Sequence, residues 1–176
     1  GTPEVIAKNL GTKFNSKEDD YIPTITNDGE TLIFTRRKVK NGKEDVFVNN
    51  RSKNSEWSNS SALPNINTDK NEGMAKFSTH SKSFFFAGCH RPESEGGCDL
   101  YEAQFKNGSV QDVKQLTGKI NSEKWDSQPS VSCDGRMLFF SSIRETGFGG
   151  ADIYISYRGP SGNWSQPENL GSQINT

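Results

Sequence analysis

The hydrophobic and polar positions of this chain alternate in short blocks. Apolar and aromatic runs of four or five residues, rich in Phe, Ile, Val and Tyr, are bounded by clusters of Gly, Asn, Asp and Ser. Runs of this length between turn-forming clusters are typical of β-strands, and no stretch keeps the period of an amphipathic helix. The pattern therefore predicts an all-β protein made of short strands joined by turns.

The clearest set of blocks lies between Val131 and Thr176. It begins with the pair Asp134-Gly135, which is followed at once by an apolar run. An Asp-Gly pair flanked by apolar runs is a strong hairpin signal, because its turn needs positive φ. The blocks predict four antiparallel strands, near residues 129–132, 138–141, 153–157 and 168–170.

Landmarks of this unit recur upstream with one spacing. Four kinds of landmark each occur three times, and successive copies stand 52 to 54 residues apart. The copies are Phe34, Phe86 and Phe140; Asp45, Asp99 and Asp152; Leu63, Leu116 and Leu170; and Asn67, Asn121 and Asn175. A shared period predicts three repeat units, at 20–66, 72–120 and 126–174. Segment 5–11 matches the end of a unit, so we expect it to be the last strand of a preceding one.

A four-stranded sheet cannot bury both faces alone, so units of about 50 residues stack side by side, and radial stacking gives a β-propeller. We predict a β-propeller of three four-stranded antiparallel blades plus one extra N-terminal strand. Propellers typically need four or more blades to close. We therefore expect the chain to be about half of a larger, six-bladed ring, and the alternative is that two copies complete each other.

The third unit also carries a specific motif pattern. Its matching residues are Ser132, Asp134, Gly135, Leu138, Phe140, Ser142, Arg144, Gly149, Gly150, Asp152, Ile153, Tyr154, Trp164, Ser165, Pro167, Asn169, Leu170 and Gly171. In this pattern the unit resembles the WD40-like repeat of the TolB-type propeller family. The other units depart from it, since Gly42-Lys43-Glu44 replaces the glycine pair in the first, and His80-Ser81 and Val110 replace the Asp-Gly turn and the Trp in the second.

The closing motifs, Trp-Ser-x-Pro-x-Asn-Leu-Gly and Ile-Asn-Thr, are most similar to propeller segments of Bacteroidota outer-membrane proteins. Those proteins also carry tetratricopeptide repeats and an OmpA-like peptidoglycan-binding domain, and some attach the type IX secretion machinery. The resemblance implies a non-catalytic scaffold in the periplasm, associated with the outer membrane, whose partner is a protein or peptide of the cell envelope. Peptidoglycan would be bound only through other domains.

Two other functions stay open at this stage. Prolyl-oligopeptidase-like peptidases carry similar repeats as a gate over a catalytic domain, and other propellers bind glycans. A propeller fold hosts unrelated activities, so the fold alone does not choose among these functions.

The sequence excludes several kinds of chemistry. With 21 basic and 22 acidic residues, there is no electrostatic case for nucleic acid or an anionic membrane. No apolar run is long enough for a membrane span. The chain has two histidines, no nucleophile elbow and no phosphate-binding loop before a helix. We therefore predict no catalytic residues.

Two of the three cysteines stand at the feet of one loop. Cys89 follows the second strand of the second unit and Cys98 precedes the third, so the two come within disulfide reach if those strands pair. Such a bridge would place the protein in an oxidising compartment. The alternative, a metal site using Cys89, His90 and Cys98, lacks a fourth ligand. We expect the disulfide and no metal or cofactor.

Propeller geometry puts the loop between the second and third strands of each blade on one face with the linkers between blades. Long, charged loops on a rigid scaffold commonly bind partners. The predicted contact residues are Arg36, Arg37, Lys38, His90, Arg91, Arg144 and Phe148. The alternative is a solvated charged rim.

Five repeated residues are expected to be architectural. Asp45, Asp99 and Asp152 each open a strand after a loop, where a carboxylate can accept backbone N–H groups and fix that loop. Trp57 and Trp164 occupy matching positions and are expected to pack between blades.

Overall fold

The computed structural model describes residues 6–78, 83–106, 109–117 and 119–176. The regular elements in these ranges are β-strands, arranged in three four-stranded antiparallel sheets in which strand order follows chain order. In the described part of the chain, no helix is long and apolar enough to cross a membrane. The all-β prediction with three four-stranded units is confirmed.

We call the three sheets blades one to three. Blade one contains β1 (Asp19–Ile25), β2 (Thr31–Arg37), β3 (Glu44–Asn50) and β4 (Ser61–Ala62). Blade two contains β5 (Glu72–Phe77), β6 (Ser83–Cys89), β7 (Cys98–Lys106) and β8 (Ser109–Gln115). Blade three contains β9 (Asp126–Val131), β10 (Met137–Ser142), β11 (Asp152–Tyr157) and β12 (Glu168–Asn169).

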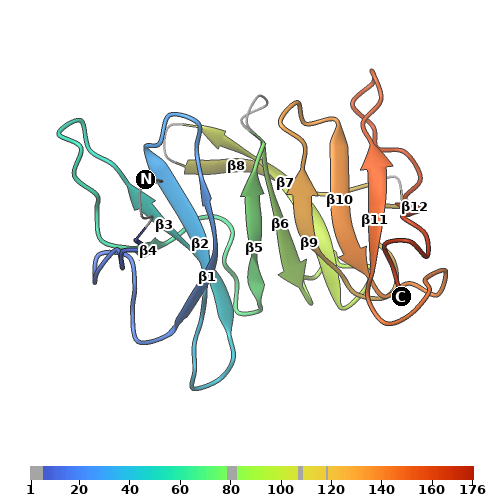
Figure 1. Cartoon of the computed structure of the whole chain (residues 1–176), viewed down its shortest axis with the longest axis horizontal. Coiled ribbons are helices and arrows are strands. Elements are labelled where there is room, and N and C mark those ends of the chain that lie inside the picture. Colours follow the sequence, from blue (N-terminus) through green and yellow to red (C-terminus); the bar gives the residue numbers. More distant parts are fainter. Residues whose placement is uncertain (1–5, 79–82, 107–108, 118) are drawn as a thin grey trace, which may run out of the picture.

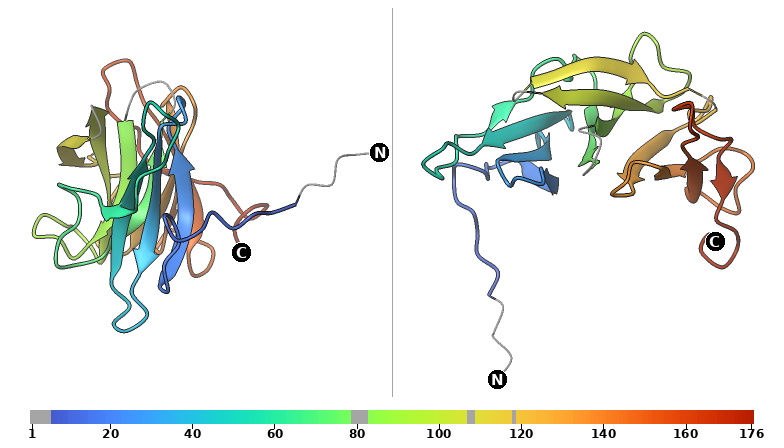
Figure 2. Two further views of the ribbon diagram at one scale, coloured as in Figure 1. Left: turned by 90° about the vertical axis from the view of Figure 1, so that its left-hand side faces the viewer. Right: turned by 90° about the horizontal axis from the view of Figure 1, so that it is seen from above.

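The blades lie side by side along the molecule (Figure 1). Seen from above, they follow an arc that is open between the first and third blades (Figure 2, right). The first strand of each blade, β1, β5 and β9, lies on the concave side of this arc. The arrangement is compatible with part of a propeller.

The predicted Asp134-Gly135 turn is present, and an equivalent turn forms at Asp28-Gly29 in blade one. Gly29 and Gly135 have φ of 70° and 71°, a region that residues with a Cβ adopt at a cost. Each preceding aspartate fixes the turn, because its carboxylate accepts the N–H of Glu30 or Arg136, at 2.9 and 3.0 Å. The predicted turn at His80-Ser81 lies outside the described residues.

Each pair of neighbouring blades buries a shared hydrophobic core. We call the side of a blade toward the preceding blade its N-side face and the other its C-side face. Mainly aliphatic residues on the C-side face of one blade meet mainly aromatic residues on the N-side face of the next. The first core contains Ile33, Val46, Val48, Leu63 and Ile66 of blade one with Phe84, Phe86 and Tyr101 of blade two. The second contains Phe85, Leu100, Leu116 and Ile120 with Leu138, Phe140, Tyr154 and Trp164.

Blade-to-blade packing therefore stabilises the whole arc. A fully buried Leu, Ile or Phe side chain contributes roughly 1.5–3 kcal/mol, and most members of both cores are almost inaccessible to solvent. Because an isolated sheet of this size leaves one apolar face wet, each blade depends on its neighbour for folding.

The strand expected near the N-terminus is not formed in the described residues. Residues 6–11 form no strand. A strand needs a hydrogen-bonded neighbour, and no described strand lies beside this segment. The chain instead joins blade one from Lys13 onward. The carbonyl of Lys13 accepts hydrogen bonds from the side-chain amide of Asn49 and the backbone N–H of Ser60, at 2.9 Å each. The ring of Phe14 packs edge-on against Trp57, at 5.4 Å between centres.

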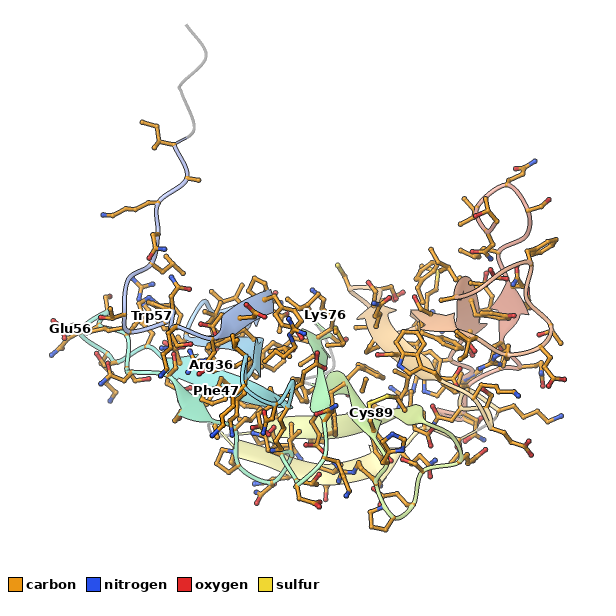
Figure 3. The ribbon with its side chains drawn as sticks, turned by 90° about the horizontal axis from the view of Figure 1, so that it is seen from below. Arg36, Phe47, Glu56, Trp57, Lys76 and Cys89 are labelled. Carbon is orange, nitrogen blue, oxygen red and sulfur yellow. A yellow bond between two sulfur atoms is a disulfide. The ribbon has the colours of Figure 1, made fainter. Side chains whose placement is uncertain are left out.

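The predicted disulfide is present. Cys89 and Cys98 face each other across the β6–β7 pair and are bonded, closing the loop between these strands (Figure 3). The alternative metal site is wrong, since both sulfur atoms are used in the bridge.

Removing this bridge tests its share of the fold's stability. The double variant Cys89→Ala/Cys98→Ala should unfold with a free energy about 2–3 kcal/mol lower, because a short closed loop is released in the unfolded chain. Urea unfolding at equal pH measures the difference. The exposed Cys133→Ala variant is the control and should change stability by less than about 0.5 kcal/mol. Equal losses in the two variants would contradict the expectation.

Candidate functional site

The loops between second and third strands and the linkers between blades share one edge of the molecule. In blades one, two and three the first strand begins opposite the end of the second, as Asp19–Arg37, Glu72–Gly88 and Asp126–Ser142 pairs show. The β2–β3 loop and the chain end Thr176 both lie at the lower edge in Figure 1. We call this edge the loop face. It contains all seven predicted contact residues, but they divide into two groups.

Three of the seven, Arg36, Arg91 and Arg144, are structural parts of the blades. Their side chains are only 13%, 12% and 11% exposed. Each guanidinium lies over two stacked aromatic rings of its own blade, an arrangement that favours a cation. The closer ring is that of Phe47 for Arg36, at 4.4 Å (Figure 3). It is Tyr101 for Arg91 and Tyr154 for Arg144, each at 4.8 Å.

The same three guanidinium groups bind the linker that enters their blade. Each donates a hydrogen bond to a linker carbonyl and forms an ion pair with an acidic residue at the start of the first strand. The carbonyls belong to Phe14, Ile66 and Ile120, at 2.9, 3.1 and 2.6 Å. The acidic residues are Asp20, Glu72 and Asp126, at 2.6, 3.8 and 2.7 Å. We call this arrangement the arginine clamp.

The acidic residue of each clamp also holds the linker directly. Its carboxylate accepts the backbone N–H of Ser16, Thr68 or Ser122, at 2.8, 2.8 and 2.7 Å. With these partners inside the chain, the side chains of the three arginines offer little exposed surface for contact with another molecule. This corrects their predicted role.

The clamp was missed because its arginines were interpreted as charged loop residues of a contact face, although they stand 55 and 53 residues apart, close to the repeat period. They stand two, five and four residues after Phe34, Phe86 and Phe140. In blade two, Gly88 leaves the space that Arg91 fills, since a Cβ there would lie 2.7 Å from the arginine Cδ. The acidic and linker positions do keep the period, and they were the signal that could have shown the site.

The repeated asparagines form a second linker contact. In each case, the asparagine side chain forms two hydrogen bonds with the residue that follows the repeated aspartate. Its Oδ1 accepts the backbone N–H of that residue, and its Nδ2 donates to the carbonyl. The asparagines are Asn67, Asn121 and Asn175. For Asn121 these bonds join the N–H and carbonyl of Leu100, at 2.7 and 3.1 Å. Asn67 does the same with Val46, and Asn175 with Ile153. Each linker is therefore fixed to the blade that it leaves.

The repeated aspartates behave as predicted in two blades. Asp99 accepts the N–H of Glu95 and Asp152 that of Phe148, so both carboxylates fix the preceding loop. In blade one, where the glycine pair is replaced, Asp45 instead binds the Lys43 ammonium at 2.6 Å. A charged side chain there substitutes for backbone donors.

The two repeated tryptophans have different partners. Trp164 packs edge-on against Phe85 of blade two, at 6.1 Å, which confirms its packing between blades. Trp57 packs on Phe14 of the N-terminal segment. Trp164 also borders a groove of about 380 Å³ between β8 and the β11–β12 turn. Across it Arg158 forms a two-pronged ion pair with Glu102, at 3.0 and 2.9 Å.

The other four predicted contact residues are exposed on the loop face. Arg37 pairs with Asp19 at 2.7 Å, and Lys38 lies 3.7 Å from Asp45. His90 is exposed, with a φ of 53°. Phe148 is 58% exposed. The loops also expose Val39 and Ile143, which the sequence analysis did not single out.

In the described residues, no group of three or more His, Cys, Asp or Glu side chains is placed to hold a metal ion. No protein-family model matches the chain. No curated protein matches it in sequence. Among solved structures, a chain of the Kuenenia stuttgartiensis hydrazine synthase is similar, with a TM-score of 0.42 and 15% sequence identity over 86% of this chain. This chain spans 25% of the length of that one. The fold and site thus define an all-β protein of three blades joined by clamped linkers.

Breaking one clamp should destabilise the protein strongly. Arg144→Leu leaves the inaccessible Asp126 carboxylate without its charge partner, and removing one member of a buried pair costs about 3–5 kcal/mol. Urea unfolding should show that loss. The control Arg37→Leu removes an exposed ion pair and should cost no more than about 1 kcal/mol. Similar small losses for both variants would show that the clamp is not structural.

Asp99 should give a measurable pH dependence. Burial raises the pKa of its carboxyl above the ordinary 3.8, although hydrogen bonds from Glu95 and Gln115 act in the opposite direction. The folded state therefore binds the Asp99 proton more tightly than the unfolded state does. The contribution of Asp99 to the free energy of unfolding is consequently lost as pH rises through its folded pKa. The stability advantage of the wild type over Asp99→Asn should shrink as pH rises above 4, in unfolding at several pH values. An advantage that grows with pH would contradict this.

Proposed function

We propose that the chain is a three-blade segment of a larger, six-bladed β-propeller ring and acts as a non-catalytic scaffold for protein–protein interaction in the cell envelope. Its resemblance to TolB-type repeats and to OmpA-family outer-membrane proteins of Bacteroidota supports a periplasmic place beside the outer membrane. The Cys89–Cys98 bridge supports an oxidising compartment. A role in type IX secretion is the most specific form of this proposal.

Polar groups that recur in every blade differ in their surroundings from those that occur in one blade only. The clamps and asparagine contacts recur in equivalent places and are satisfied inside the blades. Side chains that make the same structural contact in every blade are already engaged, so they do not support a reaction or ligand binding. What differs between blades is the set of loops on one edge.

Those loops have the features of a contact surface. Val39 is 66% exposed and Phe148 is 58% exposed, each on a loop that also presents charged or polar groups. Large exposed apolar side chains among charges are typical of surfaces that bind proteins, where aromatic residues are enriched. Because the blades fix both ends of each loop, binding would require little ordering of the backbone.

Variants of the loop face test this proposal. Immobilised wild type and the variants Val39→Asp/Phe148→Asp and Lys38→Glu are compared for proteins captured from cell-envelope extracts, by quantitative mass spectrometry. We expect specific partners to fall about tenfold or more in the loop variants, equivalent to 1.4 kcal/mol. The matched control Lys53→Glu, in the turn on the opposite edge, should capture as the wild type does. Identical capture by all variants would contradict the proposal.

A further inference from the structure

The repeated aspartates are buried in all three blades. Asp45, Asp99 and Asp152 are 7%, 0% and 1% exposed. A buried carboxylate is costly unless donors or cations meet its oxygen atoms. The three blades meet this need in different ways, and the difference between them points to a ligand.

In blades one and two, the Oδ1 atom of this carboxylate has a donor from the chain itself. In blade one the Lys43 ammonium lies 2.6 Å from Oδ1 of Asp45 and also donates to the carbonyl of Thr68, at 2.9 Å. In blade two the backbone N–H of Gly96 donates to Oδ1 of Asp99, at 3.3 Å. Blade one therefore shows that a cation fits between this carboxylate and a linker carbonyl.

Blade three satisfies only half of its carboxylate. Oδ2 of Asp152 accepts the backbone N–H of Phe148 and the side-chain amide of Asn169. Oδ1 of Asp152 is buried and has no hydrogen-bond partner among the described residues. An ionised oxygen in such a place carries a large desolvation cost unless a positive group meets it.

A sequence difference accounts for the contrast between blades one and three. Gly150 stands two residues before Asp152, the place that Lys43 holds in blade one. A Cβ on Gly150 would meet no atom within 4 Å, so the space beside it is open. The equivalent linker carbonyl, that of Thr176, lies against the same loop, because a Cβ on Gly149 would come within 2.1 Å of it.

We propose that the Asp152 carboxylate binds a monovalent cation beneath the β10–β11 loop, in the place that the Lys43 ammonium takes in blade one. One carboxylate with backbone carbonyls suits a singly charged ion, since Ca²⁺ takes about six to eight oxygen ligands. Oδ1 is inaccessible from outside, so the occupant is a small ion such as ammonium, potassium or sodium. The ion would also hold the loop of Phe148, whose N–H binds the same carboxylate.

Urea unfolding of the 176-residue chain tests this site. Ammonium, potassium or sodium chloride is replaced stepwise by choline chloride at constant ionic strength, because choline is too large for a buried site. A cation that binds only the folded state should raise the folding equilibrium constant about twofold at a concentration equal to its Kd and about elevenfold at ten times that concentration. Asp152→Asn keeps the shape of the side chain without its charge, and should lose this dependence.

Two further variants keep the test independent of any misfolding of Asp152→Asn. Gly150→Lys places an ammonium where Lys43 stands in blade one. It should be more stable than the wild type in choline chloride and should no longer respond to the small cations. Asp45→Asn is the matched control, because its carboxylate is already paired with a lysine of the chain, and it should keep the response of the wild type.

An NMR titration locates the ion. Amide signals of residues 147–152 should shift and saturate in the wild type and stay unchanged in Gly150→Lys. Equal responses of the wild type, Asp152→Asn and Gly150→Lys to every cation would contradict the proposal. Stabilisation by methylammonium as strong as that by ammonium would identify a lysine of another protein as the occupant instead. These measurements use no partner protein, so their outcome is separate from that of the loop-face capture experiment.

Discussion

The structure depends on tying each blade to the linker that enters it, and the arginine clamp does this. A single guanidinium contacts two aromatic rings of its blade, a carbonyl of the linker and a carboxylate at the first strand. The charge is nearly buried, which is tolerable because the aromatic rings, the carbonyl and the carboxylate all interact favourably with it. With the asparagine contact on the preceding blade, each linker is held from both sides and sets the relative position of two sheets.

Sequence periodicity predicted most of the fold because turns, strands and repeated contacts each depend on residues close together in the sequence. Asp134-Gly135 marks a turn whose backbone only glycine adopts easily, and the repeated aspartates and asparagines serve the same contacts in successive blades. Short apolar runs between turn-forming clusters predicted the strands, and the turns predicted that neighbouring strands pair. These features act over a few residues, so one sequence shows them.

The site was predicted less well, and the arginines show why. Arg36, Arg91 and Arg144 reach equivalent places from different backbone positions, since a long side chain can compensate for a shift of a few residues. In the sequence they stand 55 and 53 residues apart among other loop charges, so their shared contacts are not evident. The failed N-terminal strand has a related cause. Segment 6–11 has the right residues, but strand formation depends on a neighbouring strand, which a sequence motif does not reveal.

The most direct measurement of the clamp is the NMR signal of the arginine side chains in the folded protein. The account predicts that the Nε–H groups of Arg36, Arg91 and Arg144 exchange slowly with water and that their Hδ protons are shifted upfield by the stacked rings. Arg37, which is exposed, should show neither effect. If all four arginines exchange rapidly and lack ring-current shifts, the guanidinium groups are solvated and the clamp does not hold the blades together.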